Sequence, residues 1–209
     1  MRCKICQIKF TPTQFLQKCC SVEHSIEWLN LNKEKIKLAH TKETKLVEKI
    51  ARAIKKEKIE ATYTHKDYVQ KLQPLINTIV RLIDKNQACI SSGRFTGKVN
   101  AGHYFSTSEA PHLRFNLLNI YLQSEHDNTH LHSNHRGYRL GIISNFGQEH
   151  LDYIDSLFTI NRNKLTIFDL KEAIITARVI IKELKNKDLV YSNKERIELR
   201  NKYNSVIFK

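Results

Sequence analysis

The chain lacks any apolar run near the 20 residues that a membrane-spanning helix needs. Its N-terminus carries clustered cysteines rather than the pattern of a signal peptide, which argues against secretion. Internal repeats and low-complexity tracts are also missing, and residues 28–85 contain no glycine. These absences predict a folded cytoplasmic protein that makes no contact with a membrane.

Positive charge is the most pronounced feature of the composition. The 209 residues include 35 Lys and Arg against 21 Asp and Glu, for a net charge of +14. Such an excess favours a polyanion partner, because cationic side chains release the counterions condensed on nucleic acid. A basic protein without such a partner would have the same composition. A length of 209 residues is enough for one or two small domains, and the hydrophobic share of 41% is ordinary.

Four of the five cysteines precede residue 21, which in a reducing compartment indicates metal ligands rather than disulfides. Cys3 and Cys6 are separated by two residues, which is knuckle spacing, and after thirteen more residues Cys20 is followed by His24 with three residues between them. Three thiolates and one imidazole suit Zn²⁺ in a closed tetrahedral site. Residues 1–27 therefore predict a structural zinc knuckle. Cys19 is an alternative ligand, and free buried cysteines are the alternative to a metal site.

Residues 28–85 predict a long basic helical arm, in which Lys and Glu alternate with Ile and Leu. Leu46, Ile50 and Ile54 recur every four residues and so share one helix face. A charged stretch of this kind is usually a solvated helix face, and a DNA-tracking arm is the less common interpretation. Pro74 should kink or restart the helix because it removes a hydrogen-bond donor.

Residues 86–145 have a different texture and predict a compact hairpin–helix core. Three of the six glycines fall within 89–106 beside short β-prone pieces, which favours a hairpin or an irregular ribbon. A helix is expected to begin after Asn128. Residues 146–209 predict a helical region, in which Thr166 and Asp169 have the spacing of a capping box. A periodic apolar stripe follows them. The fold class expected is α+β, mainly α. The stripe comprises Leu170, Ile174, Ala177, Ile181 and Leu184.

The stretch from residue 100 to residue 134 carries the chemistry. His103 lies in an Ala-Gly-His-Tyr turn, Asn119 in the next segment, and Asn128 and His130 in an Asn-x-His step. Imidazoles bind metal or take a proton from water, and amides orient them. Elements in His, Asn, His order resemble the HNH nucleases. The blocks AGHY, LRFN-x-x-NI and N-x-H-x-x-x-N resemble more closely the NinG (Rap) family of lambdoid-phage recombination endonucleases.

The resemblance implies a metal-dependent endonuclease that cleaves branched DNA, such as Holliday junctions and D-loops, in phage or prophage recombination. It implies His103 as general base and His130 as ligand of a single Mg²⁺ or Mn²⁺, although the sequence leaves the two roles interchangeable. Asn119 would orient the site, and Asn128 would fix the helix start or the ligand tautomer. The family pattern also selects Cys20 and His24 as zinc ligands. The resemblance also implies DNA contacts at Arg114, Asn134 and Arg139. Alternatively, Asn134 caps a turn and the two arginines form surface salt bridges.

Several positions depart from the family pattern. Asn100 stands where relatives have an aspartate, which removes a charged oxygen that a hard metal ion prefers. Relatives carry a second zinc cluster of two C-x-x-C pairs, whereas this chain has Cys89 with Ser92 and Ser124 with Asp127. His126, Asp127 or His132 would then assist the metal.

Two rival functions remain open in the sequence. The first is a catalytically inactive, zinc-stabilised protein that binds branched DNA by its structure. The second is an adaptor that binds phage or host recombination proteins. A homodimer would suit the two-fold symmetry of a junction, and the apolar stripe of the helical arm would supply its interface.

Overall fold

The computed structural model describes residues 1–95, 97–131, 134–160 and 164–208. His132, proposed above as a metal helper, lies outside these ranges. The chain divides into two compact units, Met1–Thr62 and Tyr63–Lys209. The described residues are mostly helical, with one two-stranded antiparallel sheet, which confirms the expected fold class. None of the described helices has the length and apolar character required to cross a membrane.

The first unit holds the cysteines and one long helix, α1 (Val22–Glu60). Ser21 caps its start by accepting a hydrogen bond from the backbone N–H of His24 at 3.2 Å. The side chains of the predicted stripe remain in solvent, with Leu46, Ile50 and Ile54 exposed by 57%, 50% and 49%. The stripe thus packs against nothing else that the structure describes in this unit.

The predicted arm of residues 28–85 is divided in the structure between two helices. Helix α1 ends at Glu60, and α2 (His65–Ile83) restarts where Asp67 accepts hydrogen bonds from the N–H and the hydroxyl of Thr64. Pro74 lies inside α2, so the helix restarts before the proline and not at it. Helix α2 belongs to the second unit because its apolar face is buried there.

A small hairpin lies at the centre of the second unit. Strand β1 (Val99–His103) pairs with β2 (Ile120–Ser124), with His103 opposite Ile120 and Gly102 opposite Tyr121. Side chains alternate between the two faces of a strand. Ala101 and Ile120 accordingly enter one hydrophobic core and Tyr121 enters another, so all five residues of β2 are buried.

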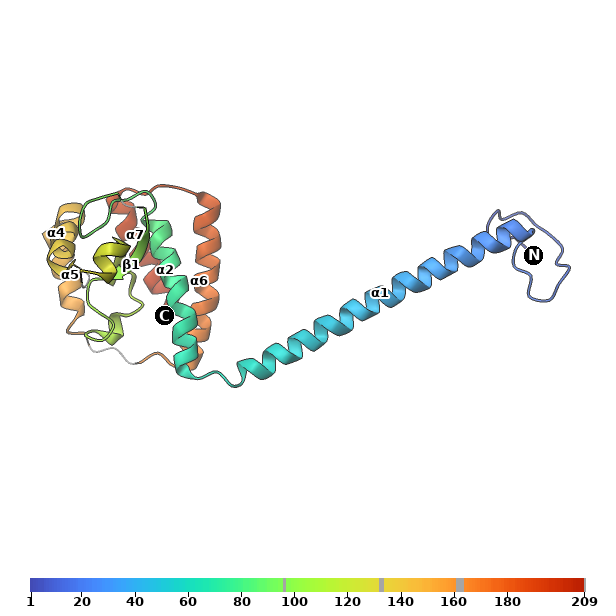
Figure 1. The fold of residues 1–209 in the computed structure, drawn as a ribbon, viewed down its shortest axis with the longest axis horizontal. Coiled ribbons are helices and arrows are strands. Elements are labelled where there is room, and N and C mark those ends of the chain that lie inside the picture. The colour runs from blue at the N-terminus through green and yellow to red at the C-terminus, as the bar shows by residue number, and fades with distance from the viewer. Residues whose placement is uncertain (96, 132–133, 161–163, 209) are drawn as a thin grey trace. The chain divides into compact units, whose positions relative to one another are not determined.

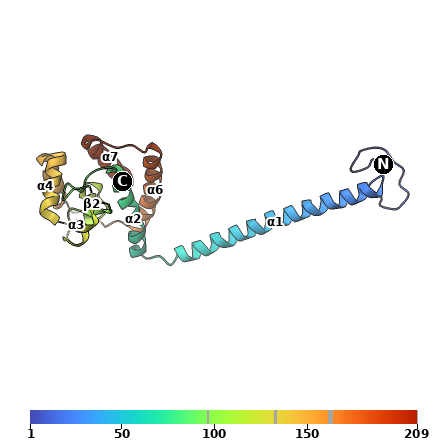
Figure 2. The same cartoon turned by 45° about the horizontal axis from the view of Figure 1, so that its top comes forward.

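Helices cover both faces of the hairpin. The first core contains α2, α6 (Ile167–Lys187) and α7 (Asn193–Ile207), and the second contains α4 (His135–Phe146) and α5 (Gln148–Leu157). Figures 1 and 2 show the first group on one side of the hairpin and α4 on the other. The predicted regions 86–145 and 146–209 therefore share one compact unit with α2.

The start of α6 and its apolar face agree with the sequence. Thr166 and Asp169 form the capping box that their spacing predicted, which confirms that expectation. The stripe from Leu170 to Leu184 packs into the first core, with Ile181 partly buried. Two short 3-10 helices, η1 (Pro111–Leu113) and η2 (Leu117–Asn119), occupy the connection between the strands.

The helix expected after Asn128 begins earlier. Helix α3 spans Glu125–Thr129, because the Ser124 side chain caps it by accepting the Asp127 N–H at 3.1 Å. His130 is its C-cap, so the chain leaves the helix at the predicted metal ligand. The next helix, α4, starts only at residue 135. The prediction was wrong about the helix start because it missed the serine cap.

One buried carboxylate joins α2, β2 and α7. Asp84, fully buried at the C-cap of α2, accepts hydrogen bonds from Arg196 Nε at 2.8 Å and from Arg200 Nη2 at 2.7 Å. It also accepts the backbone N–H of Leu122 at 2.9 Å. Arg200 Nε in turn donates to the Leu117 carbonyl at 3.1 Å. This network fixes strand β2 against helix α7.

Candidate functional site

The N-terminal cysteines form a candidate metal centre. The donor atoms of Cys3, Cys6, Cys20 and His24 all lie within 4.8 Å of one another. Their closest separations are 3.1 Å from Cys20 Sγ to His24 Nδ1 and 3.5 Å from Cys6 Sγ to Cys20 Sγ. Cys3 Sγ lies 3.7 Å from His24 Nδ1. A tetrahedral zinc site with the usual bond lengths has donor separations of about 3.5–3.8 Å, so this donor set fits a metal ion such as zinc.

Local backbone geometry brings these donors together. A bridge between Arg2 and Lys9 closes the turn that carries the first two cysteines. Burial would raise the pKa of the Cys3 thiol, but backbone hydrogen bonds from Cys6, Ile5 and Cys20 outweigh it and lower the pKa to about 5. A thiolate is the form that binds metal. Among the described residues, this quartet is the one group of three or more His, Cys, Asp or Glu donors close enough to share an ion, and Cys19 is not part of it.

His103 ends strand β1 and is held by one specific contact. Its Nε2 lies 2.8 Å from the backbone carbonyl oxygen of Arg114. A carbonyl only accepts, so Nε2 carries the proton and Nδ1 keeps its lone pair. Burial lowers the pKa of His103 below 6.5, the Arg114 charge lowers it further, and the bond to the carbonyl only partly offsets them. The ring is therefore neutral at pH 7 and able to accept a proton at Nδ1.

Asn119 is fully buried and fixes the segment that contains Arg114. Its Oδ1 accepts the N–H of Phe105 at 2.8 Å, and its Nδ2 donates to the carbonyls of Phe105 and Leu113 at 3.0 and 3.2 Å. One amide thus ties the end of β1 to the turn that precedes Arg114. The Asn119 side chain thus contacts backbone groups and not the ring of His103 in the bonds described.

Asn128 approaches the same strand from α3. A Cβ built on Gly102 would lie 3.1 Å from Asn128 Oδ1, so a larger residue there would displace this amide. Strand alternation places Gly102 and Asn100 on one face and His103 on the other. The structure therefore brings Asn128 beside the face that carries Asn100. His130 is exposed at the end of α3, with its ring 5.7 Å from that of His126.

The segments around Cys89 and Asp127, where the chain departs from the family pattern, form a hydrogen-bonded cluster. The Ser91 hydroxyl donates to Asp127 Oδ2 at 2.7 Å, and Cys89 Sγ lies 3.6 Å from the same oxygen. Cys89 Sγ also accepts the N–H of Ser124 at 3.1 Å, and Asn134 Nδ2 lies 3.3 Å from Asp127 Oδ2. Hydrogen bonds thus join the 89–92 turn to α3 without requiring an ion.

The hydrogen bonds of this cluster stabilise the charged form of the Asp127 carboxylate. Burial would raise the pKa of Asp127, but hydrogen bonds from Ser91, Asn134, His126 and Ser124 outweigh it and lower the pKa to about 2. The carboxylate is ionised at neutral pH and satisfied by these donors. Ser91 was missed in the sequence, because a contact across 36 positions has no spacing signal.

The three predicted DNA contacts differ in their surroundings. Asn134 adopts a left-handed conformation with φ of 42° and caps α4 by accepting the Gly137 N–H, which is the alternative that the sequence allowed. Arg139 pairs with Asp155 at 2.8 Å, as its alternative role required. Arg114 has no ion pair within the described residues and lines a cavity.

Comparisons with known proteins agree with the motif blocks. The family model described as "Bacteriophage Lambda NinG protein" matches residues 1–188. Protein ninG of Enterobacteria phage H19B is 35% identical over 88% of this chain and 94% of its own length. Protein ninG of Escherichia phage 933W is 30% identical over the same shares, and that of Escherichia phage lambda is 37% identical over 57% of this chain and 58% of its own.

These features define a two-unit α+β protein with a candidate structural metal centre in one unit and a hairpin–helix site in the other. The chain belongs to the NinG family of phage proteins. No solved structure matches it.

Proposed function

We propose that this protein is a metal-dependent endonuclease that cleaves branched DNA, including Holliday junctions and D-loops, during phage recombination. The observation that carries the proposal is the 2.8 Å hydrogen bond from His103 Nε2 to the Arg114 carbonyl. It fixes the tautomer in which Nδ1 is a base, on a residue that occupies the matching position of the family motif. The net charge of +14 favours DNA as the substrate.

In the proposed reaction, His103 Nδ1 takes a proton from a water molecule. The water oxygen bonds to phosphorus while the bond from phosphorus to the leaving sugar oxygen breaks, with inversion at phosphorus. Burial helps because it lowers the pKa of His103 and keeps the ring unprotonated at neutral pH. Asn119 acts as a positioning residue, since it holds the backbone that carries the carbonyl partner of His103.

Asn100 and His130 would hold the divalent ion, which when bound would neutralise charge on the scissile phosphate, and Asn128 would fix the tautomer of His130. These donors are uncharged, and the nearby carboxylate of Asp127 is already satisfied by hydrogen bonds. An amide oxygen and an imidazole suit Mn²⁺ better than Mg²⁺, which prefers charged oxygens. We expect cleavage to be faster with Mn²⁺ than with Mg²⁺.

Removing the base tests this assignment most directly. Labelled four-way junction, Y-fork and linear duplex are incubated with the full chain in Mn²⁺, in Mg²⁺ and without divalent metal. His103→Ala should reduce junction cleavage by about 10²–10⁴-fold, the usual contribution of a general base, while junction binding survives. His130→Ala should shift the metal dependence to higher Mn²⁺ concentration. His40→Ala, on the exposed surface of α1, is the matched control.

The dependence of the cleavage rate on pH distinguishes a general base from a residue that only supports the fold, because only the base makes the rate follow its own protonation. The base works when unprotonated, so cleavage should fall as pH drops through the lowered pKa, with a midpoint below 6.5. His103→Ala should abolish this acidic limb in any residual activity. Wild-type cleavage rates retained in His103→Ala and His130→Ala would overturn the site.

The neutral donor set also favours a second candidate, a DNA-binding protein with an inactive centre. Asn100 supplies no charged oxygen, so the ion would bind weakly. This candidate predicts salt-sensitive junction binding with no cleavage of any substrate in any divalent metal. The assay above therefore decides between the two.

We also propose that the protein acts as a homodimer joined through α1. Large apolar side chains along this helix are exposed, although burying them would be favourable. A second copy presents the same stripe, and a two-fold dimer suits a two-fold symmetric junction. The stripe side chains of this interface are Leu46, Ile50 and Ile54.

Sedimentation equilibrium tests this dimer by measuring the mass of the protein in solution. The wild type should weigh twice the 24.5 kDa of one chain, and Ile50→Lys with Ile54→Lys should shift it to the monomer because buried charges oppose association. Thr41→Lys, exposed on α1 about 180° around the helix from Ile50, should leave the dimer intact. A monomeric wild type at micromolar concentration would contradict the proposal.

A further inference from the structure

A cavity of about 700 Å³ opens on the second unit, between the start of α2, the η1 turn, the segment before α6 and the end of α7. It falls in the usual size range of small-ligand sites, roughly 300–1,000 Å³. Its wall includes the side chain of Arg114, whose carbonyl holds His103. The cavity is thus adjacent to the proposed base, although His103 does not line it.

The lining combines positive charge with aromatic surface. Lys66, Arg114 and Lys164 are among the thirteen residues that line it, and none of the thirteen is Asp or Glu. Within the ranges that the structure describes, no carboxylate pairs with any of these three cations. Phe115 and Phe208 supply the aromatic part, with near-parallel rings whose centroids are 6.3 Å apart. An anion attached to a planar group matches this lining.

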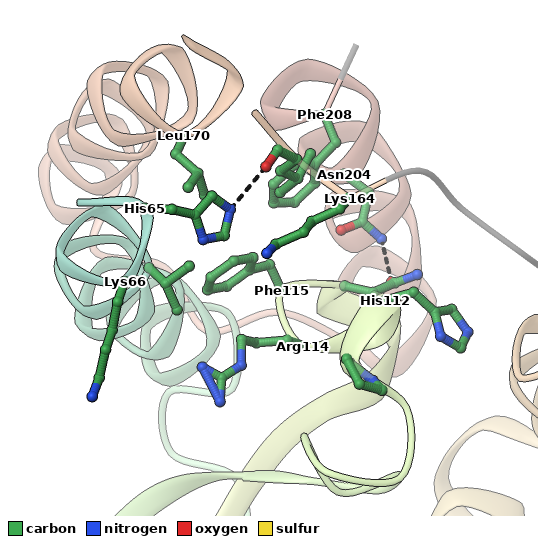
Figure 3. A pocket seen from close by; sticks show the side chains of 13 residues that line it. His65, Lys66, His112, Arg114, Phe115, Lys164, Leu170, Asn204 and Phe208 are labelled. Atoms are coloured by element: carbon green, nitrogen blue, oxygen red, sulfur yellow. Dashed lines mark hydrogen bonds between the residues drawn. The ribbon is translucent and has the colours of Figure 1, made fainter. Parts of the chain in front are cut away.

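Figure 3 shows how these side chains lie. The Lys164 stem crosses the cavity toward the ring of Phe115, and Arg114 lies on the other side of that ring. The His65 ring borders the same space, held by a 2.9 Å bond from Nε2 to the Leu165 carbonyl. Lys66 points away from the centre, so Lys164 and Arg114 are the cations placed for a ligand inside.

The two nearby helix starts each carry a carboxylate, whose negative charge disfavours a phosphate there. Asp67 and Asp169 accept hydrogen bonds from the residues that cap α2 and α6. A phosphate would therefore bind the side chains rather than a helix terminus. Two separate cations and an aromatic wall point to a phosphate next to a base.

We propose that this cavity binds one unpaired nucleotide of DNA, with its base against Phe115 and Phe208 and its two flanking phosphates contacting Lys164 and Arg114, one each. A stacked, paired base cannot reach such a concave site, whereas a branch point supplies unstacked nucleotides. The proposal rests on DNA as the partner in the proposed function but not on cleavage. It would make the protein prefer branched DNA without reading its sequence, because base stacking on aromatic rings tolerates any base.

Three matched probes test the base contact. Fluorescence anisotropy without added divalent metal compares a duplex, the same duplex with one bulged thymidine, and the same duplex with an abasic bulge. The last two carry equal numbers of phosphates. The wild-type full chain should bind the thymidine bulge about fivefold or more tighter than the abasic bulge, the lower range of stacking on aromatic side chains. Equal affinities would overturn the proposal.

Variants test the cavity itself. Phe115→Leu should abolish the preference for the thymidine bulge, and Phe208→Leu, which removes a less buried ring, gives the same test if Phe115→Leu misfolds. Lys164→Glu and Arg114→Gln should weaken binding of both bulged probes and lower the salt slope by about 1 per phosphate contact. Lys185→Glu, exposed on α6 outside the cavity, is the charge control.

Two results would refute the site. One is an equal loss of bulge binding in Lys185→Glu and Lys164→Glu, which would show a general charge effect. The other is an unchanged preference for the thymidine bulge in both phenylalanine variants. Because no step requires cleavage, a protein that fails to cut any junction can still pass this test.

Discussion

Asp84→Asn is expected to lower the free energy of unfolding of the second unit by about 3–5 kcal/mol, the usual cost of breaking a buried ion pair from one side. The substitution removes the negative charge that faces two buried guanidiniums, Arg196 and Arg200, whose side chains are 3% and 0% exposed. Neither arginine can reach water to recover its hydration. Arg200 also contacts the ring of Tyr121, so a displacement of the Arg200 side chain would disturb the second core as well.

Guanidinium denaturation followed by circular dichroism measures this change. Asp188→Asn is the matched control, because Asp188 pairs with Lys85 at the surface and its side chain is 73% exposed. Exposed pairs contribute about 0–1 kcal/mol, so this variant should unfold almost as the wild type does. An Asp84→Asn protein within 1 kcal/mol of the wild type would show that the two arginines find other partners.

Removal of zinc is expected to unfold the N-terminal cysteine module. Binding of a structural zinc ion of this ligand type contributes about 10–16 kcal/mol of apparent free energy, and so short a segment has no hydrophobic core to replace it. Purified protein should carry about one equivalent of zinc per chain. After chelation, four of its five cysteines should react rapidly with a thiol reagent, whereas Cys89 stays buried in the second unit.

Two neighbouring cysteines provide the control for this prediction. Cys20→Ser should lose the metal because Cys20 belongs to the quartet, and Cys19→Ser should retain it because Cys19 does not. Less than half an equivalent of zinc in the wild type, prepared without chelators, would reject the metal centre. Equal zinc loss in the two variants would reject the ligand assignment.

Local features were readable from the residues because each depends on neighbours in the chain. The cluster of cysteines followed from spacing within 24 residues, although the family resemblance was needed to choose Cys20 over Cys19. The capping box at Thr166 followed from a spacing of three residues. The stripe on α6 follows from helical periodicity alone. In each case the interacting groups are close in sequence, so the backbone brings them together in one turn or one helix.

The prediction from the sequence failed where the break between two helices had no strong sequence signal. Residues 28–85 were treated as one arm because glycine is absent and Pro74 was the visible interruption. The actual break precedes α2 and depends on the Thr64–Asp67 cap. Strand β2 was missed for a related reason: it is buried on both faces and shows no alternation of polar and apolar residues.

The identity of the family and its motif residues came from the order of residues along the chain, which a sequence carries in full. How those residues are used depended on contacts between distant segments. The bond of His103 to the Arg114 carbonyl, the satisfaction of Asp127 by Ser91, and the double pairing of Asp84 each join positions that lie 11 to 116 residues apart. Burial strengthens such contacts by removing competing water, and burial is a property of the packed chain rather than of any residue in it.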